Sequence, residues 1–178
     1  NGQPYIYVET IGGGSGARYN KDGLDAVHVH MTNTSNLPVE ALEMEYPLMV
    51  ERYALHENSG GAGTYRGGLG IIRTIRILPD SGDTVLVGAA TERARRRPWG
   101  LAGGQPGGNA SLKIYRKGEL LADCPKPRNI VLQVGDMVEL KTAGAGGYGP
   151  VEGRDAAQIK RDYAEGIIDD EWLRSAGI

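Results

Sequence analysis

Two histidines, His28 and His30, have the spacing in this sequence that most directly suggests chemistry. They lie two positions apart in AVHVHMTN, residues 26–33, where small apolar and polar residues alternate as in a strand. Side chains two apart on a strand point to one face, and two imidazoles on one face can chelate a divalent metal. Histidines on a half-buried strand can equally be hydrogen-bonded structural groups, and the spacing supplies no third ligand.

The second candidate site is the glycine-rich run SGGAGTYRGGLG, residues 59–70. Its glycines permit unusual backbone angles and leave N–H groups uncovered, and the Arg66 guanidinium is a fork-shaped donor. Such a loop can bind a carboxylate or a related anion. It can also be a loop packed tightly against another subunit where only glycine fits, and we favour this second interpretation.

Two other motifs are weaker. Residues 12–17 fit the dinucleotide fingerprint G-x-G-x-x-A, but the turn-forming sequence RYNKDG follows where a helix should begin, so we do not expect a dinucleotide site. The chain contains no P-loop motif and no G-x-S-x-G nucleophile motif. Arg93 and the arginines at 95–97 precede Pro98 and Trp99, a run that favours a solvated or interface-facing strip.

Composition narrows the class of protein. The chain has 178 residues, with 20 basic and 22 acidic side chains and a formal net charge of −2. That balance gives no reason to expect nucleic acid or a membrane as a partner. With one cysteine and no apolar run of membrane-spanning length, we expect a soluble, cytoplasmic protein.

The elements that must position these residues are mostly strands. Strands are predicted at residues 4–10, 26–33 and 48–56, with a short helix at 39–46 that Pro47 ends. Further strands are predicted as a hairpin of 68–80 with 84–93, a hairpin of 110–115 with 119–122, and two strands within 129–141. Two amphipathic helices follow, at 156–163 and at 169–176 with Asp169 as N-cap.

These elements predict an α+β fold, mostly antiparallel sheet with glycine-rich loops and short C-terminal helices. Residues 1–150 would form a β-rich body, and residues 151–178 a helical tail packed on the same domain.

Five segments in order resemble the hydantoinase B/oxoprolinase family, which includes N-methylhydantoinase B, the second half of 5-oxoprolinase, and subunits of acetone and acetophenone carboxylases. The segments are ETIGGGSGA at 9–17, HVHMTNTSNLPVE at 28–40, EYP at 45–47, the glycine-rich run at 59–70 and VGDMVELKTAGAGGYG at 134–149. Two places depart from the family pattern. Ala145 interrupts a glycine run, and HEN at 56–58 stands where Arg-Pro-Asp is commoner.

The resemblance implies a small subunit or C-terminal fragment of an ATP-dependent enzyme that opens cyclic amides. Ketone carboxylation of the acetone or acetophenone type is the alternative, and a non-enzymatic binding or assembly module is a third. In this family the metal-binding residues lie in the N-terminal half, and ATP is used by a hydantoinase A-like subunit. We therefore expect divalent metal and ATP/Mg in partner chains, a hetero-oligomer, and no activity from the isolated chain.

The same resemblance implies that this chain lines the substrate cavity and the subunit interface. The candidate cavity residues are His30, Asn33, Thr34 and Arg66. The catalytic residues are left unassigned, and no metal site is expected in this chain, His28 and His30 being the weak metal candidates.

Overall fold

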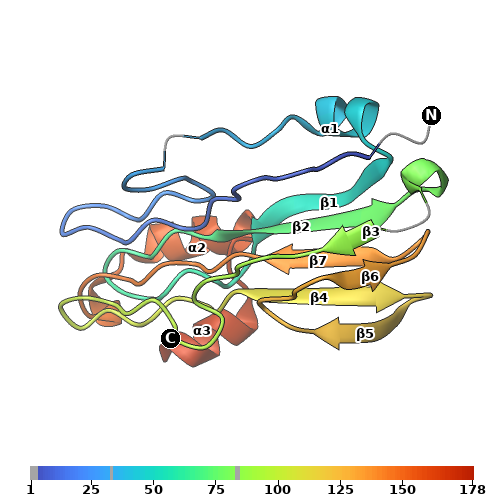
Figure 1. Ribbon diagram of the computed structural model, residues 1–178. Helices are drawn as coiled ribbons and strands as arrows, with labels where there is room; N and C mark the ends of the chain where they lie inside the picture. Colours follow the sequence, from blue (N-terminus) through green and yellow to red (C-terminus); the bar gives the residue numbers. More distant parts are fainter. Residues whose placement is uncertain (1–3, 33, 83–84) are drawn as a thin grey trace.

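A five-stranded antiparallel sheet and a two-stranded sheet form the centre of the molecule (Figure 1). The computed structural model describes residues 4–32, 34–82 and 85–178. The larger sheet has the order β1-β2-β7-β4-β5, made of β1 (Leu48–His56), β2 (Gly70–Ile77), β7 (Met137–Lys141), β4 (Ser111–Arg116) and β5 (Glu119–Asp123). The smaller sheet pairs β3 (Val85–Val87) with β6 (Ile130–Leu132).

The main apolar core lies at the sheet region, defined here as β1 to β7 with the short helix α1 (Val39–Glu45). Leu42 of α1 is fully buried and packs with Leu48, Ile77 and Ile114. The helix ends where expected, because Tyr46 precedes a proline and takes extended angles, φ −125° and ψ 147°. The α+β class is confirmed, with antiparallel strands and three short α-helices.

Several local predictions are also confirmed. Strand β1 has the predicted bounds, and β4 and β5 form the predicted hairpin. Its turn residues Lys117 and Gly118 have φ values of 51° and 83°, as a tight hairpin turn requires. The Asp169 carboxylate caps the last helix by accepting from the N–H groups of Glu171 and Trp172.

The hairpin predicted from residues 68–80 and 84–93 is wrong. Strand β2 lies between β1 and β7, whereas β3 pairs with β6 in the other sheet. A 3-10 turn, Pro79–Ser81, separates the two strands. Part of the predicted turn and the start of the second strand, Asp83 and Thr84, lie outside the described residues.

The strands predicted at 4–10 and 26–33 are also wrong, because neither segment joins a ladder. A single isolated bridge joins Gly13 to Val27. Ala26 and His30 have φ values of 52° and 64°, and such left-handed residues interrupt a strand. The β-branched and aromatic composition of residues 4–10 therefore does not reveal whether the segment has a hydrogen-bonded neighbour.

The glycine-loop region, defined as residues 12–17, 59–70, 98–108 and 143–149, lies at the end of the sheet where β1 finishes and β2 begins (Figure 1). The segments of this region touch backbone to backbone. A Cβ added to Gly67 would lie 1.9 Å from the Ala145 carbonyl oxygen, and one added to Gly146 would lie 1.9 Å from that of Trp99. The tight packing is present within this chain, and packing of the run against another subunit stays a prediction.

The C-terminal helices α2 (Ala156–Ala164) and α3 (Asp170–Ala176) contact these loops. Trp172 is 4% exposed, and its indole N–H donates to the Gly60 carbonyl at 2.8 Å. Trp172 packs with Ala62, Ile168 and Ala176 in a second, smaller apolar cluster. None of the helices in the described ranges has the length and apolar character needed to cross a membrane.

Candidate functional site

A cluster of polar side chains gathers around His28, beside β1. Its Nε2 lies 3.3 Å from the Asn36 amide oxygen, and its Nδ1 lies 3.4 Å from the Thr34 hydroxyl. The Asn36 amide nitrogen in turn donates to the Tyr53 hydroxyl. The segment after His28 thus folds back so that Thr34 and Asn36 face the imidazole, and this brings two of the singled-out residues, His28 and Thr34, together.

The network continues into the core through Arg73. Its guanidinium lies 5.1 Å from the centre of the Tyr53 ring, and its Nη1 lies 2.8 Å from the Glu9 carboxylate. Arg73 is 1% exposed, so the ion pair is needed to keep the buried charge stable. Glu9 also accepts from the Leu37 N–H at 2.8 Å and from the Tyr7 hydroxyl. Burial, and then this hydrogen bond to Glu9, raises the pKa of Tyr7 well above its ordinary value.

His30 is not brought into this cluster. The His30 side chain is exposed, and its left-handed backbone removes the shared strand face on which chelation with His28 depended. Asn33 lies outside the described residues. Within the part of the chain that the structure describes, no three His, Cys, Asp or Glu side chains are grouped to hold a metal ion.

Arg66 lies in a buried ion cluster that the sequence patterns did not reveal. Its Nη1 is 3.1 Å from Asp25 and its Nε is 3.4 Å from Asp162. Arg154 lies 2.6 Å from the same Asp162 and holds Asp22 through two nitrogens, at 2.8 and 2.9 Å. Residues from a loop, the glycine-rich run and the C-terminal tail meet here, so no short-range spacing could have predicted the cluster.

The interaction between Asp22 and Arg154 keeps both of these side chains charged. Burial opposes the ionised form of Asp22, but the hydrogen bonds and positive charge of Arg154 outweigh it and lower the Asp22 pKa. The Arg154 pKa is correspondingly raised, again against the effect of burial. The Asp25 carboxylate accepts from the Arg66 side chain and also, at 2.7 Å, from the Leu69 N–H. Through Asp25, the Arg66 side chain therefore fixes the path of the loop that leads to His28. Its predicted approach to a substrate cavity stays a prediction.

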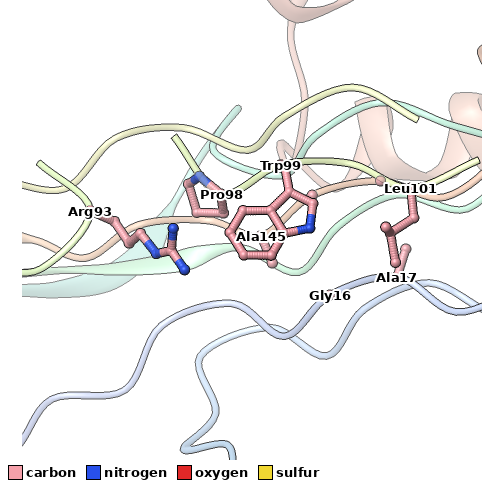
Figure 2. A pocket seen from close by; sticks show the side chains of 9 residues that line it. Gly16, Ala17, Arg93, Pro98, Trp99, Leu101 and Ala145 are labelled. Carbon is pink, nitrogen blue, oxygen red and sulfur yellow. The ribbon is translucent and has the colours of Figure 1, made fainter. Parts of the chain in front are cut away.

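An open hollow of about 230 Å³ lies on the glycine-loop region (Figure 2). It is lined by Gly16, Ala17, Arg93, Pro98, Trp99, Leu101 and residues 145–147. The Arg93 guanidinium lies 5.0 Å from the Trp99 ring, and Trp99 is 66% exposed. An aromatic face beside a guanidinium can hold a planar or anionic group. The basic run before Pro98 therefore contributes one arginine to a hollow, whereas Arg95 and Arg96 are exposed to solvent.

Comparison with known proteins identifies relatives across most of this structure. Residues 1–151 match the model of the hydantoinase B/oxoprolinase family. A protein from Pseudomonas sp. (strain NS671), named as one of the subunits of a candidate D-/L-hydantoinase, is 36% identical over 94% of this chain. The 5-oxoprolinase 1 of Arabidopsis thaliana is 36% identical over 80% of it.

Two solved structures have the same fold. An ATP-dependent caprolactamase from Pseudomonas jessenii matches 92% of this chain with a TM-score of 0.76 and 25% identity. A nucleotide-free acetone carboxylase matches 93% with a TM-score of 0.73 and 19% identity, which shows the fold alone.

All four relatives are much longer than this chain. It spans 28% of the Pseudomonas hydantoinase relative, 29% of the caprolactamase, 25% of the acetone carboxylase and 11% of the Arabidopsis protein. The family match nevertheless includes the His28 cluster, Arg73 with Glu9, and the glycine-loop region. The chain belongs to the hydantoinase B/oxoprolinase family.

Proposed function

We propose that this chain is a portion, or a small subunit, of an ATP-dependent enzyme that hydrolyses cyclic amides. The observation that carries the proposal is the 36% identity over 94% of the chain to the candidate D-/L-hydantoinase subunit from Pseudomonas. Two further relatives, a 5-oxoprolinase and a caprolactamase, have names that also refer to cyclic amides. Three such relatives favour ring opening as the reaction.

Ketone carboxylation is the alternative. The fold of acetone carboxylase matches with a TM-score of 0.73, but at 19% identity this likeness concerns the fold only. Two relatives named for cyclic amides are each 36% identical to this chain, well above the 19% of acetone carboxylase, and we therefore favour hydrolysis.

In this proposal the metal and ATP are handled by other polypeptides. The expected partners are a hydantoinase A-like ATPase subunit and the metal-binding N-terminal portion of a hydantoinase B-like protein, joined in a hetero-oligomer. A metal would polarise the amide carbonyl, and ATP would supply the driving force. The ring nitrogens of His28 face Asn36 and Thr34, a donor set that does not fit a resident metal.

This chain would contribute a polar wall to the substrate cavity at the subunit interface. His30, Asn33 and Thr34 are the proposed wall residues, and the exposure of His30 and Thr34 supports this role. Thr34 is held by His28, which is itself held by Asn36. Arg66 would act from behind this wall, by fixing Asp25 and the chain that leads to His28. Such support is how a protein positions groups that contact a substrate.

The test is reconstitution of the complex. This chain is combined with a hydantoinase A-like subunit and the N-terminal hydantoinase B-like portion, and hydrolysis of hydantoin, 5-oxoproline and caprolactam is measured with and without ATP. We expect ATP-dependent opening of at least one ring by the complex and none by the chain alone. Carboxylation of acetone with bicarbonate in place of ring opening would select the alternative. Ring opening by the chain alone would overturn the proposal.

A pair of threonine variants tests the wall. Thr34→Ala removes the hydroxyl beside His28, whereas Thr32→Ala removes an exposed hydroxyl that donates to the nearby Val29 carbonyl. We expect kcat/KM of the complex to fall about tenfold for the first change and to stay unchanged for the second. Equal activity of the two variant complexes would remove Thr34 from the wall.

A further inference from the structure

Residues 4–11 have the exposure pattern of a strand that lacks a neighbour. Every second side chain is partly buried, and these are Tyr5, Tyr7, Glu9 and Ile11. The side chains between them are exposed, with Ile6 at 82% and Val8 at 84%. Alternation with a period of two is the signature of an extended chain with one face on a core. Here the outer face is apolar as well.

The inner face holds the segment in place through side chains. The rings of Tyr5 and Tyr7 lie 5.7 and 5.5 Å from the ring of Tyr46, next to α1. Glu9 forms the ion pair with buried Arg73 of β2, 2.8 Å away. The segment is therefore extended before any partner binds.

Within the described part of the chain, the backbone of this segment joins no sheet. Residues 4–12 make no backbone hydrogen bond to any other described residue, and pairing begins only where the Gly13 N–H meets the Val27 carbonyl. A row of unpaired N–H and C=O groups is a template for another strand. Edges exposed to solvent commonly carry outward charges, but the outward residues here are Ile6, Val8 and Thr10.

We propose that residues 4–11 are a docking strand, which pairs with an extended segment from the remainder of the hydantoinase B-type enzyme. Main-chain pairing requires an extended partner, and the exposed Ile6 and Val8 require apolar side chains at alternate positions in it. The relatives supply such additional polypeptide, because this chain spans only 28% of the hydantoinase relative. The inference rests on the proposed function, since the partner is the remainder of that enzyme.

Hydrogen–deuterium exchange tests the docking strand directly. The full chain is measured alone, at two concentrations, and in complex with the N-terminal hydantoinase B-like portion and the hydantoinase A-like subunit. We expect alternate amides within residues 5–12 to exchange about 100-fold more slowly in the complex, because a single neighbouring strand accepts from every second N–H. Unchanged exchange in an assembled complex would overturn the proposal. Protection that rises with concentration in the chain alone would also overturn it, by making a second copy the partner.

A variant pair sharpens the result. Ile6→Lys with Val8→Lys places charges on the outer face, whereas Leu120→Lys with Leu121→Lys places them on exposed positions of the edge strand β5. We expect the first pair to weaken assembly at least about tenfold with unchanged melting temperature, and the second to leave assembly unchanged. Equal weakening by both pairs would count against the docking strand. A complex with protected residues 5–12 and no ring-opening activity would refute the proposed function only.

Discussion

The sheet region and the glycine-loop region are stabilised in opposite ways. In the sheet region, apolar side chains such as Leu42 and Ile114 fill the space between elements. In the glycine-loop region, segments lie so close that there is no space for a side chain at Gly67 or Gly146. Its backbone groups bond across segments, as between the Gly61 N–H and the Ala145 carbonyl at 2.8 Å.

This difference determines what each region tolerates. A core made of side chains loses packing when one is shortened, and its neighbours can partly relax. A core made of touching backbones cannot move aside for one added methyl group without breaking the hydrogen bonds that hold it. The most damaging change in the molecule is therefore the smallest addition at a glycine, not the largest deletion from the sheet.

Gly67→Ala is expected to have the largest effect. The new Cβ would lie 1.9 Å from the Ala145 carbonyl oxygen, so we expect a loss of more than about 4 kcal/mol or failure to fold. Gly16→Ala is the control, because a Cβ there meets nothing within 4 Å, and its effect should stay within about 1 kcal/mol. Urea unfolding monitored by circular dichroism measures both. Similar losses for the two variants would disprove the backbone-packing account.

Arg154→Met should have the next largest effect. It leaves the buried carboxylates of Asp22 and Asp162 without one of their cations, which typically costs about 3–5 kcal/mol. The control is Lys126→Met, which breaks a solvent-exposed pair with Glu92 and should leave the free energy of unfolding almost unchanged. Equal free energies of unfolding for Arg154→Met and the unaltered protein would show that the ion cluster does not join the tail to the loops.

Ile114→Ala tests the sheet region. The side chain is fully buried in the main core, so we expect a loss of about 2–5 kcal/mol with the fold retained. Leu120→Ala on the exposed face of β5 should change stability by less than about 0.5 kcal/mol. Thermal unfolding can rank both against Gly67→Ala. A larger loss from Ile114→Ala than from Gly67→Ala would reverse the proposed order of the two regions.

Acid should destabilise the junction between the regions by a smaller amount. Burial lowers the pKa of His56, whose Nδ1 lies 2.9 Å from the Thr142 carbonyl oxygen and donates to it. As the pH falls, His56 therefore takes up a proton more readily in the unfolded chain than in the folded protein. The free energy of unfolding should decrease as the pH drops below about 6.5. His56→Gln should reduce the loss of melting temperature between pH 7 and pH 5. If the melting temperature of His56→Gln changes with pH as much as that of the unaltered protein, His56 is not the source of the acid destabilisation.

A second loss of stability is expected at lower pH from Asp22. Although burial opposes ionisation of Asp22, Arg154 lowers the Asp22 pKa below its ordinary value. The ionised Asp22 carboxylate therefore stabilises the folded protein at neutral pH. It should disappear as the pH falls through and below about 4. In Arg154→Met the melting temperature should be less sensitive to pH in this range. The same sensitivity as in the unaltered protein would show that Asp22 is not the titrating group.

Local sequence signals predicted the elements whose causes are local. Pro47 ended α1, Lys117 and Gly118 formed the hairpin turn, and Asp169 capped the last helix. Strand pairing was less predictable, because the β-branched and aromatic composition of residues 4–10 favours a strand but does not show whether a neighbouring strand exists.

The candidate site was predicted only in part. Thr34 contacts Nδ1 of His28 directly, but the other ring nitrogen faces Asn36, which was not among the predicted site residues. Binding of an anionic ligand by the glycine-rich loop stays a prediction, whereas within the chain Arg66 contacts the carboxylates of Asp25 and Asp162. Contacts between residues so distant in sequence have no signature in spacing.

Native mass spectrometry of the untagged protein from its own cells tests the central claim most directly. The account predicts that this region is found in one assembly with the remainder of a hydantoinase B-type protein, in the same or a separate chain, and with a hydantoinase A-like subunit. That assembly should open a cyclic amide with ATP. A lone species of 19.0 kDa with neither partner would contradict the account.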